Sequence, residues 1–308
     1  MEEASVFKNK LPEPTVKKIK IGLGTFGSGK GPSDKKYINF LKAAIKIGIT
    51  NIDTAEVYGN GRAEKLVGES IKGFKRKKLF ITTKVWETNL KYGDAINSAK
   101  NSLKRLNTEY IDLYLIHRPN PKISLKETIK AMDFLVKKKM VRHMGVSNFS
   151  LKLLKEAQSY TKNKIVVNQV EYNLLKRKPE EGLLDYCQKN DILLVAYRPL
   201  MKGLLIKRGF KILDNLSKKY NKTQAQISLN WLISKENVAV IPRTISISHL
   251  KDNLGAIGWK LSNEDYNKLD KYFKRLWYIY KFFVKHILAI IGIVNGCIRV
   301  LHRRKKCK

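Results

Sequence analysis

Cysteine is scarce in this chain of 308 residues, which has only Cys187, Cys297 and Cys307. These positions match neither a CxxC motif nor a cysteine–histidine metal site, so we expect no disulfide framework and no bound metal. The first residues, Met1–Ala4, include two acids and are followed by no apolar run. We therefore expect no signal peptide, and we expect the protein in a reducing cytoplasm.

Acidic residues are also few, with 26 Asp and Glu against 62 Lys and Arg and a net charge of +36. Such a surface attracts nucleic acids, anionic lipids and phosphorylated small molecules alike. The sequence has no base-reading element and no aromatic–basic RNA motif, so we do not expect nucleic acid as a partner. Basic runs at 75–78 and 137–139 are interpreted as solvated helix faces.

Short apolar runs alternate with segments of helical spacing along most of the chain. The predicted strands are residues 20–24, 50–53, 79–84, 110–117, 141–147, 165–171, 192–197 and 238–241. Runs such as 113–116 are apolar throughout, which is typical of parallel strands buried on both faces. The predicted helices are residues 35–48, 62–74, 94–106, 124–137, 150–160, 180–189 and 223–234, with a short helix near 249–253.

Eight similar strand–helix units without a composition break predict an α/β fold, a (β/α)8 TIM barrel over residues 1–272. A doubly wound open sheet is the main alternative. The composition changes near residue 273, because residues 271–308 hold eleven Lys and Arg and no acid beside a dense apolar run at 282–300. We expect residues 273–308 to be a basic, hydrophobic C-terminal extension of the barrel.

Two glycine patterns near the start do not fit the sites they formally match. Gly22-x-Gly24-x-x-Gly27 has the spacing of a dinucleotide-binding fold, but that motif needs a helix at its third glycine, and residues 28–32 read Ser-Gly-Lys-Gly-Pro. Gly31 also stands where a phosphate-binding P-loop needs a hydroxyl. A glycine-rich loop at the end of the first strand, where backbone approaches a ligand closely, is the better interpretation.

Polar side chains that suit proton transfer follow three neighbouring strands. Asp53 ends the second strand with Tyr58 just beyond it, Lys84 ends the third, and His117 ends the fourth. Barrel active sites lie at the carboxyl ends of strands, so we expect the four to converge. An ammonium beside a phenol lowers the phenol pKa, a carboxylate holds the ammonium, and an imidazole orients the substrate oxygen. Each residue alone has a structural explanation, but together they indicate proton transfer to a carbonyl.

With these residues in place, the chain resembles an aldo-keto reductase from about residue 17 to 272. The stretches that carry the resemblance are GLGTFG at 22–27, NIDTAEVYG at 51–59, TKVW at 83–86, LIHRP at 115–119, GVSNF at 145–149, NQVEYN at 168–173 and AYRPL at 196–200. The resemblance implies that Tyr58 is the general acid, that Lys84 and Asp53 tune it, and that His117 orients the substrate. Hydride would come from a nicotinamide, without a metal.

The resemblance also implies an extended nicotinamide cofactor across the barrel mouth. Ser147, Asn148 and Gln169 would hold the carboxamide, and Tyr197 would stack on the ring. Lining the rest of the cofactor would be Gly24, Thr25, Phe26, Arg198, Leu200, Ile241, Thr244, His249 and Asn253. Arg198 stands where the family usually has Ser, and His249 where an Arg often stacks on adenine.

The loops after the seventh and eighth strands are where barrels commonly bind phosphate. Arg243 lies in the second of these loops and suits a terminal 2′-phosphate, so we expect NADP(H) rather than NAD(H). For the substrate pocket, Phe26 and Trp86 offer apolar walls. Arg118 stands where an aromatic is frequent in the family and would attract an acidic or polyhydroxylated substrate.

We therefore expect an NADPH-dependent reductase of aldehydes or ketones, reversible as an alcohol dehydrogenase. The alternatives are an NAD(P)-dependent sugar or polyol dehydrogenase, and a cofactor-binding auxiliary subunit of a membrane protein. For the extension, residues 282–301 reach spanning length only by including Lys285, His286, Asn295 and Arg299, which are costly inside a bilayer. We favour peripheral membrane contact, with packing on the barrel and a full span as alternatives.

Overall fold

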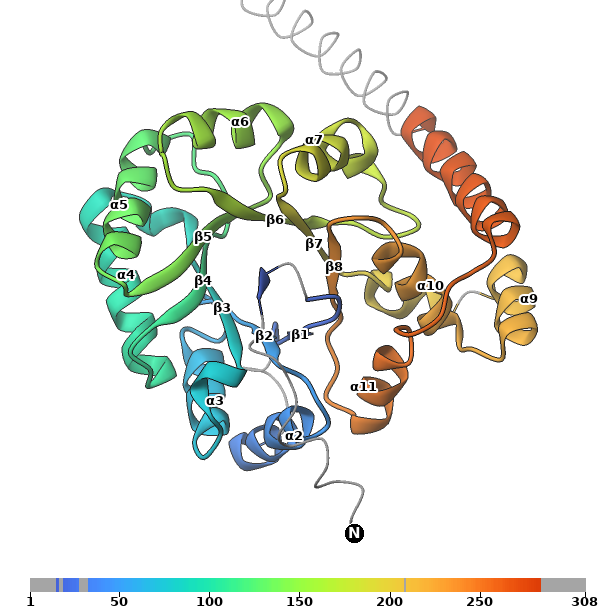
Figure 1. The fold of residues 1–308 in the computed structure, drawn as a ribbon, viewed down its shortest axis with the longest axis horizontal. Coiled ribbons are helices and arrows are strands. Elements are labelled where there is room, and N and C mark those ends of the chain that lie inside the picture. Colours follow the sequence, from blue (N-terminus) through green and yellow to red (C-terminus); the bar gives the residue numbers. More distant parts are fainter. Residues whose placement is uncertain (1–14, 17–18, 28–32, 208, 284–308) are drawn as a thin grey trace, which may run out of the picture.

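Eight parallel strands in chain order surround a central axis, and helices form a ring outside them (Figure 1). The computed structural model describes residues 15–16, 19–27, 33–207 and 209–283. The predicted (β/α)8 barrel is confirmed. Its strands are β1 (Leu23–Gly24), β2 (Asn51–Asp53), β3 (Phe80–Val85), β4 (Ile111–Ile116), β5 (Val141–Ser147), β6 (Ile165–Glu171), β7 (Leu193–Tyr197) and β8 (Val238–Ile241).

The strands alternate with helices that cover the outside of the barrel. These are α2 (Asp34–Lys46), α3 (Arg62–Ile71), α4 (Tyr92–Leu106), α5 (Leu125–Lys137), α6 (Leu151–Ser159), α7 (Leu183–Lys189), α8 (Leu204–Lys207), α9 (Lys211–Tyr220), α10 (Gln224–Ile233) and α11 (Ile247–Leu254). Short 3-10 turns lie at Arg76–Lys78, Glu87–Asn89, Lys178–Glu180 and Met201–Gly203. The sequence did not predict α8 and α9, which follow β7.

The barrel closes between β8 and β1 through a short seam. Ile21 and Val240 form a single parallel bridge, and the Gly22 amide donates to the Val240 carbonyl at 2.8 Å. Gly24 adds a bond from its amide to the Pro242 carbonyl at 3.2 Å. A Cβ at Gly24 would lie 3.2 Å from the Ile241 carbonyl oxygen, so glycine permits this close approach of the two backbones.

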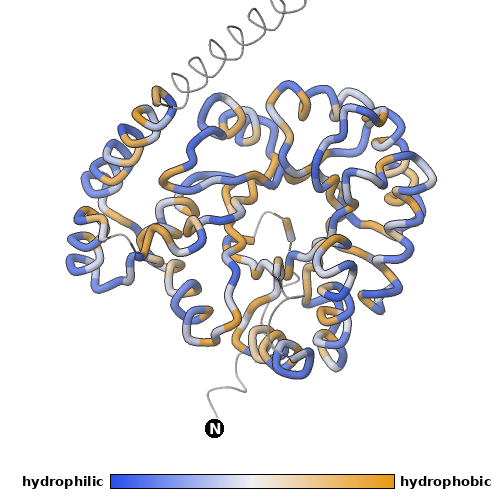
Figure 2. Tube along the Cα trace, turned by 180° about the vertical axis from the view of Figure 1, so that it is seen from behind, coloured by the Kyte–Doolittle hydropathy of each residue, from blue (hydrophilic) through white to orange (hydrophobic). Residues whose placement is uncertain are grey.

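Apolar side chains fill both sides of the strand layer. Inside the barrel, a small cluster includes Phe80, Leu113, Val167 and Val195. The larger core lies between the strands and the helices, and every residue of β3, β4 and β8 is buried. Figure 2 shows the apolar stretches on the strands around the axis and more hydrophilic residues on the outer helices. This two-sided burial explains the unbroken apolar runs in the sequence.

Side-chain caps fix where several helices begin. Ser124 and Ser150 accept from backbone amides at the starts of α5 and α6. At α10, Thr223 and Gln226 form a reciprocal capping box, and Ser246 caps α11. Each cap satisfies an amide that has no partner within its helix, so these helices start at defined residues on the side of the barrel where the strands end.

Residues 263–283 form a helix outside α10 that runs from beside α9 toward α7, drawn in red in Figure 1. It buries Phe273 and Trp277, and the buried Arg177 guanidinium pairs with Asp270 Oδ1 at 2.6 Å. The predicted boundary after residue 272 therefore falls inside this helix, whose first part packs on the barrel.

The rest of the predicted extension, residues 284–308, lies outside the described residues, and with it most of the segment for which we predict membrane contact. Among the helices that the structure describes, none combines the length and apolar character needed to cross a membrane.

Candidate active site

The four residues predicted to transfer a proton lie together at the carboxyl ends of the strands. Asp53 is the last residue of β2, Lys84 lies near the end of β3, and His117 directly follows β4. Tyr58, in the loop after β2, has its ring centroid 5.2 Å from Lys84 Nζ and 5.6 Å from the His117 ring. The structure therefore brings the phenol, the ammonium and the imidazole into one cluster.

Lys84 and Asp53 form a buried ion pair beneath the phenol. Lys84 Nζ donates to Asp53 Oδ1 at 2.6 Å and to the Thr54 carbonyl at 2.7 Å. Burial alone would lower the pKa of Lys84, but Asp53 and Tyr58 together outweigh it and raise this pKa. Lys84 is therefore a fixed positive charge at neutral pH.

The pKa of Tyr58 moves in the direction opposite to our prediction. Burial raises the pKa of the phenol, and Asp53 adds to the rise, while Lys84 lowers it without offsetting the burial. The prediction that the ammonium would lower this pKa is right for the contribution of Lys84 and wrong for the net shift. The reason is that burial deprives the phenolate of solvation by water, and the attraction of one ammonium does not compensate for that loss.

His117 is neutral at physiological pH. Burial lowers the pKa of its imidazole to about 3, and the cationic Lys84 and Arg118 add to this effect. Its Nδ1 atom is buried and has no hydrogen-bond partner among the described residues. Because no acceptor faces Nδ1, the single proton of the neutral ring is better placed on Nε2, from which it can be donated.

An aromatic rim surrounds the phenol at the barrel mouth. Phe26 contacts Tyr58 edge-on with ring centroids 5.2 Å apart, and Trp86 contacts His117 at 5.0 Å. The Arg118 guanidinium lies 5.9 Å from the Trp86 ring. Phe26 is 61% exposed. The three residues predicted to bind substrate thus flank the proton-transfer cluster.

Asn148 connects several of the residues predicted to hold the nicotinamide end. Its Nδ2 donates to the His117 carbonyl at 2.9 Å and to Ser147 Oγ at 3.1 Å, and its Oδ1 accepts from the Tyr197 hydroxyl at 2.9 Å. Gln169 has a contact that the resemblance does not imply, because its Nε2 donates to Asp53 Oδ2 at 2.8 Å. The Asn148 backbone amide also donates to the Gln169 carbonyl at 2.9 Å, which links these cofactor residues to the ion pair.

At the predicted phosphate end, Arg243 lies against the glycine-rich loop. A Cβ on Gly27 would lie 3.4 Å from the Arg243 guanidinium carbon, and Gly27 has φ +81°, which favours glycine. Ile241 ends β8 and Thr244 follows Arg243. His249 is exposed on α11, and Asn253 is buried there.

Arg198 and Leu200 lie in the loop after β7. Arg198 is exposed and pairs with Glu171 at 3.4 Å, so its charge is partly neutralised within the protein. Leu200 is partly buried against the outer core.

The residues present fit a nicotinamide dinucleotide with a 2′-phosphate. Thr25, next to Gly24, has a buried hydroxyl that lacks a hydrogen-bond partner among the described residues. Arg243 forms no ion pair within the described part of the chain. A hydroxyl and a guanidinium without partners, on the two loops at the β8–β1 seam, are donors available to an anionic ligand.

The sequence did not predict a role for Glu56, which supports the rim from below. Its Oε1 accepts from the Trp86 amide at 2.6 Å and from Asn89 at 3.0 Å. The position of Glu56, between Asp53 and Tyr58 in a loop at a strand end, could have indicated such a role. Its partner Trp86 lies 30 residues away in sequence, so the sequence did not identify the contact.

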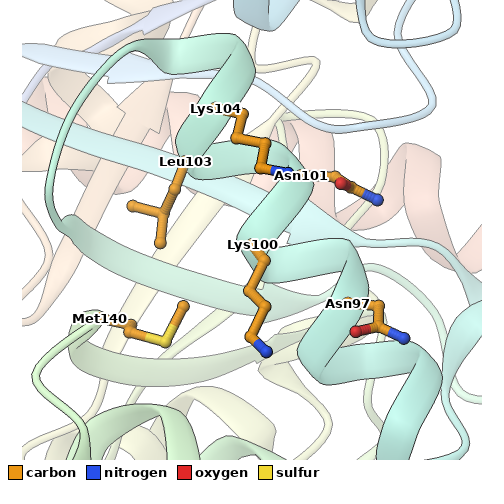
Figure 3. Close-up of a pocket in the computed structure, with 6 residues that line it drawn as sticks. All are labelled: Asn97, Lys100, Asn101, Leu103, Lys104 and Met140. Atoms are coloured by element: carbon orange, nitrogen blue, oxygen red, sulfur yellow. The ribbon is translucent and has the colours of Figure 1, made fainter.

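A separate hollow of about 480 Å³ opens between α4 and Met140 (Figure 3). Its lining residues are Asn97, Lys100, Asn101, Leu103, Lys104 and Met140. Met140 precedes β5, so the hollow faces the amino ends of the strands, away from Tyr58. It contains no acid, imidazole or thiol, and we place the chemistry at the barrel mouth.

Known proteins are similar to this chain over most of its described length. The model of the Aldo/keto reductase family matches residues 18–274. The chain is 36% identical over 256 residues to methylglyoxal reductase YeaE from Escherichia coli, covering 82% of this chain and 89% of that protein.

Solved structures of aldo-keto reductases are also similar to this chain. The thermostable aldo-keto reductase Tm1743 has a TM-score of 0.80 at 46% identity, with 86% of this chain and 97% of that chain covered. An aldo-keto reductase from Klebsiella pneumoniae, solved with NADPH, has a TM-score of 0.76 at 35% identity, with 82% and 90% covered.

Proposed function

Since the chain belongs to the aldo/keto reductase family and reduces carbonyl compounds with NADPH, we propose that Tyr58 is the proton donor of this reaction. The observation that carries the proposal is the position of the phenol between the buried Lys84–Asp53 pair and the neutral His117 ring. A phenol held between a fixed cation and a neutral hydrogen-bond donor is equipped to protonate an oxygen.

When bound, NADPH supplies a hydride to the carbonyl carbon. As the C=O bond becomes a C–O bond, the oxygen takes the proton from the Tyr58 hydroxyl, and the resulting phenolate is stabilised by the Lys84 ammonium. Asp53 keeps that ammonium in place, and Tyr58 regains its proton from solvent. His117 donates its N–H to the carbonyl oxygen and orients it before transfer.

For the cofactor, we propose that Ser147, Asn148 and Gln169 hold the nicotinamide and that Tyr197 packs on its ring. Support comes from the hydrogen bonds that join Asn148 to Ser147 and Tyr197. The phosphate end would contact Arg198, Arg243 and Thr244. The remaining contacts would come from Gly24, Thr25, Phe26, Leu200, Ile241, His249 and Asn253.

As substrates we propose small aldehydes and ketones, with methylglyoxal the first to be tested because the relative from Escherichia coli is a methylglyoxal reductase. Phe26 and Trp86 would form the apolar walls against such molecules. The reverse reaction, oxidation of a sugar or polyol, is the second candidate, because the chain is also 34% identical to an NADP-dependent D-sorbitol-6-phosphate dehydrogenase from Malus domestica.

Tyr58→Phe tests the proposed acid, because it removes the hydroxyl and keeps the ring. We expect methylglyoxal reduction, followed by NADPH absorbance, to fall at least about 100-fold, the scale of general acid catalysis. NADPH binding, followed by fluorescence, should be retained. Lys84→Met should be nearly as damaging, while the exposed Tyr92→Phe is the control. Activity of Tyr58→Phe within a few-fold of the parent would refute the role.

We also propose that the C-terminal extension contacts anionic membranes peripherally. Support comes from the exposed side chains near the end of the helix at 263–283 and from the basic sequence of residues 303–306. The exposed side chains are Tyr278, Ile279, Tyr280, Phe282 and Phe283.

Flotation with phosphatidylserine vesicles tests this contact. The full-length protein should float and be released by high salt, and a variant with residues 303–306 changed to Gln should float less. Protein that stays in the soluble fraction would contradict membrane contact, and protein released only by detergent would indicate a span.

A further inference from the structure

We propose that Arg118 selects carbonyl substrates that carry a carboxylate or a phosphate near the reacting carbon. The inference rests on the proposed function, because it takes the cluster around Tyr58 as the place where the carbonyl is reduced. It makes Arg118 a specificity-determining residue, with no part in proton transfer.

The first support is the position of Arg118 beside the proposed reaction centre. It directly follows His117 at the end of β4 and is exposed at the barrel mouth. Its guanidinium lies 5.9 Å from the Trp86 ring, and the same ring contacts the His117 imidazole at 5.0 Å. A small substrate whose oxygen meets Tyr58 and His117 therefore has its far end within reach of this cation.

The second support is that Arg118 has no carboxylate partner within the described part of the chain. Six other described arginines form ion pairs, namely Arg62, Arg76, Arg105, Arg142, Arg177 and Arg198. The two besides Arg118 that form none are Arg243, at the proposed phosphate end, and Arg275, on the C-terminal helix. Arg118 is thus the unpaired guanidinium on the substrate side.

Three acids at this end of the barrel are already engaged by other groups. Asp53 accepts from Lys84 and Gln169, Glu56 from Trp86 and Asn89, and Glu171 pairs with Arg198. The positive charge of Arg118 contributes to the lowered pKa of His117 and slightly opposes the rise in the pKa of Tyr58. An anionic substrate would supply the countercharge that the protein does not.

The chemistry of the side chain favours carboxylate or phosphate over a neutral polar group. A guanidinium presents a planar pair of N–H donors that matches two oxygens of either anion. The guanidinium carbon lies 5.9 Å from the centroid of the Trp86 ring, at the outer limit of cation–π range, so the ring favours this position of the charge.

The experiment compares pairs of aldehydes in which one member carries an anionic group and the other does not. Succinic semialdehyde and butanal have the same chain and differ in a carboxylate, and glyceraldehyde 3-phosphate and glyceraldehyde differ in a phosphate. We expect the parent to prefer the anionic member of at least one pair. Arg118→Gln should lower kcat/KM for that member by about 10- to 100-fold, mainly through KM, the range of a charged hydrogen bond. The neutral members should stay within about threefold.

Two further variants sharpen the comparison. Arg118→Lys should retain part of the preference, because it keeps the charge and loses the planar donor pair, and Arg275→Gln should behave like the parent. The proposal is overturned if the parent prefers neither anion, if it reduces methylglyoxal but none of the four probes, or if Arg118→Gln slows charged and neutral substrates equally. Full activity of Tyr58→Phe on the same probes would instead refute the proposed function, so the two failures are distinguishable.

Discussion

At Tyr58 two influences on a phenol oppose each other. Lys84 favours the phenolate, and burial favours the neutral phenol and raises its pKa. Because the effect of burial is larger than that of Lys84, the proton stays on Tyr58 over the whole neutral pH range and is available for donation. The neutral His117 beside it cannot compete as an acid.

The pH dependence of reduction follows from these two groups. A donor must be protonated, so raising its pKa extends activity toward high pH, and kcat/KM should fall only above about pH 10. His117, with a pKa of about 3, should cause no acid limb between pH 5 and 8. Rates measured with a stable aromatic aldehyde from pH 5 to 10.5 check both points. An inflection between pH 6 and 9 would contradict this assignment.

Arg243 should distinguish the two nicotinamide cofactors. Arg243→Ala removes the guanidinium proposed to bind the 2′-phosphate and should weaken NADPH binding by about 1.5–3 kcal/mol. NADH, which lacks that phosphate, should bind almost as before. Fluorescence titrations of both cofactors measure this, with Arg275→Ala as the control. Equal losses for both cofactors would show that Arg243 does not read the phosphate.

The sequence predicted which residues would meet at the site, because parallel strands bring their carboxyl ends to one face. It did not predict the net pKa shift of Tyr58, since burial depends on how Phe26 and His117 pack around the phenol. Nor did it predict the bond from Gln169 to Asp53, which joins residues 116 positions apart.

At the scale of elements, α3 and α4 pack closely at Gly68. A Cβ there would lie 2.7 Å from the Arg105 carbonyl oxygen and 2.8 Å from Leu106 backbone atoms. Because backbone cannot move aside as a side chain does, this contact fixes the distance between the two helices. Arg105 also pairs with the buried Glu64 of α3 at 2.6 Å.

Gly68→Ala should therefore destabilise the protein by about 1–3 kcal/mol, the usual cost of overpacking. Gly93, in the first turn of α4, has no atom within 4 Å of a built Cβ. Gly93→Ala should be neutral or stabilise by up to about 1 kcal/mol, since it reduces the freedom of the unfolded chain. Urea unfolding of both variants measures the difference. Equal stability of the two would contradict the close packing.

The strands were predicted well because burial on both faces requires an unbroken apolar run. Such a run can be recognised in the sequence without knowing which elements pack against it. Three of them, β5, β6 and β8, have the predicted bounds. Helix α9 was missed although Leu213 and Leu216 show helical spacing and are buried. No strand separates α9 from α10. A prediction based on alternating strands and helices therefore did not include it.

At the scale of the whole molecule, the net charge of +36 makes the folded state repel itself. Salt screens this repulsion, while the exposed ion pairs that salt also weakens, such as Lys130–Glu127, contribute little stability. Raising NaCl from 20 to 200 mM should therefore increase Tm by a few degrees. An uncharged osmolyte at equal osmolality is the control. An unchanged or lower Tm would mean that repulsion is not a significant cost.

The seam between β8 and β1 has a consequence for how the protein is made. Ile21 and Val240, which bridge it, are about 220 residues apart in the chain. At roughly 5–20 residues per second, the ribosome needs on the order of 10 to 45 s to supply the second partner after the first has emerged. During that interval one edge of the first strand has no neighbour to pair with. The barrel therefore closes only after β8 has emerged from the ribosome. Until then, we expect early pairing with β2, or chaperones, to keep that edge from aggregation.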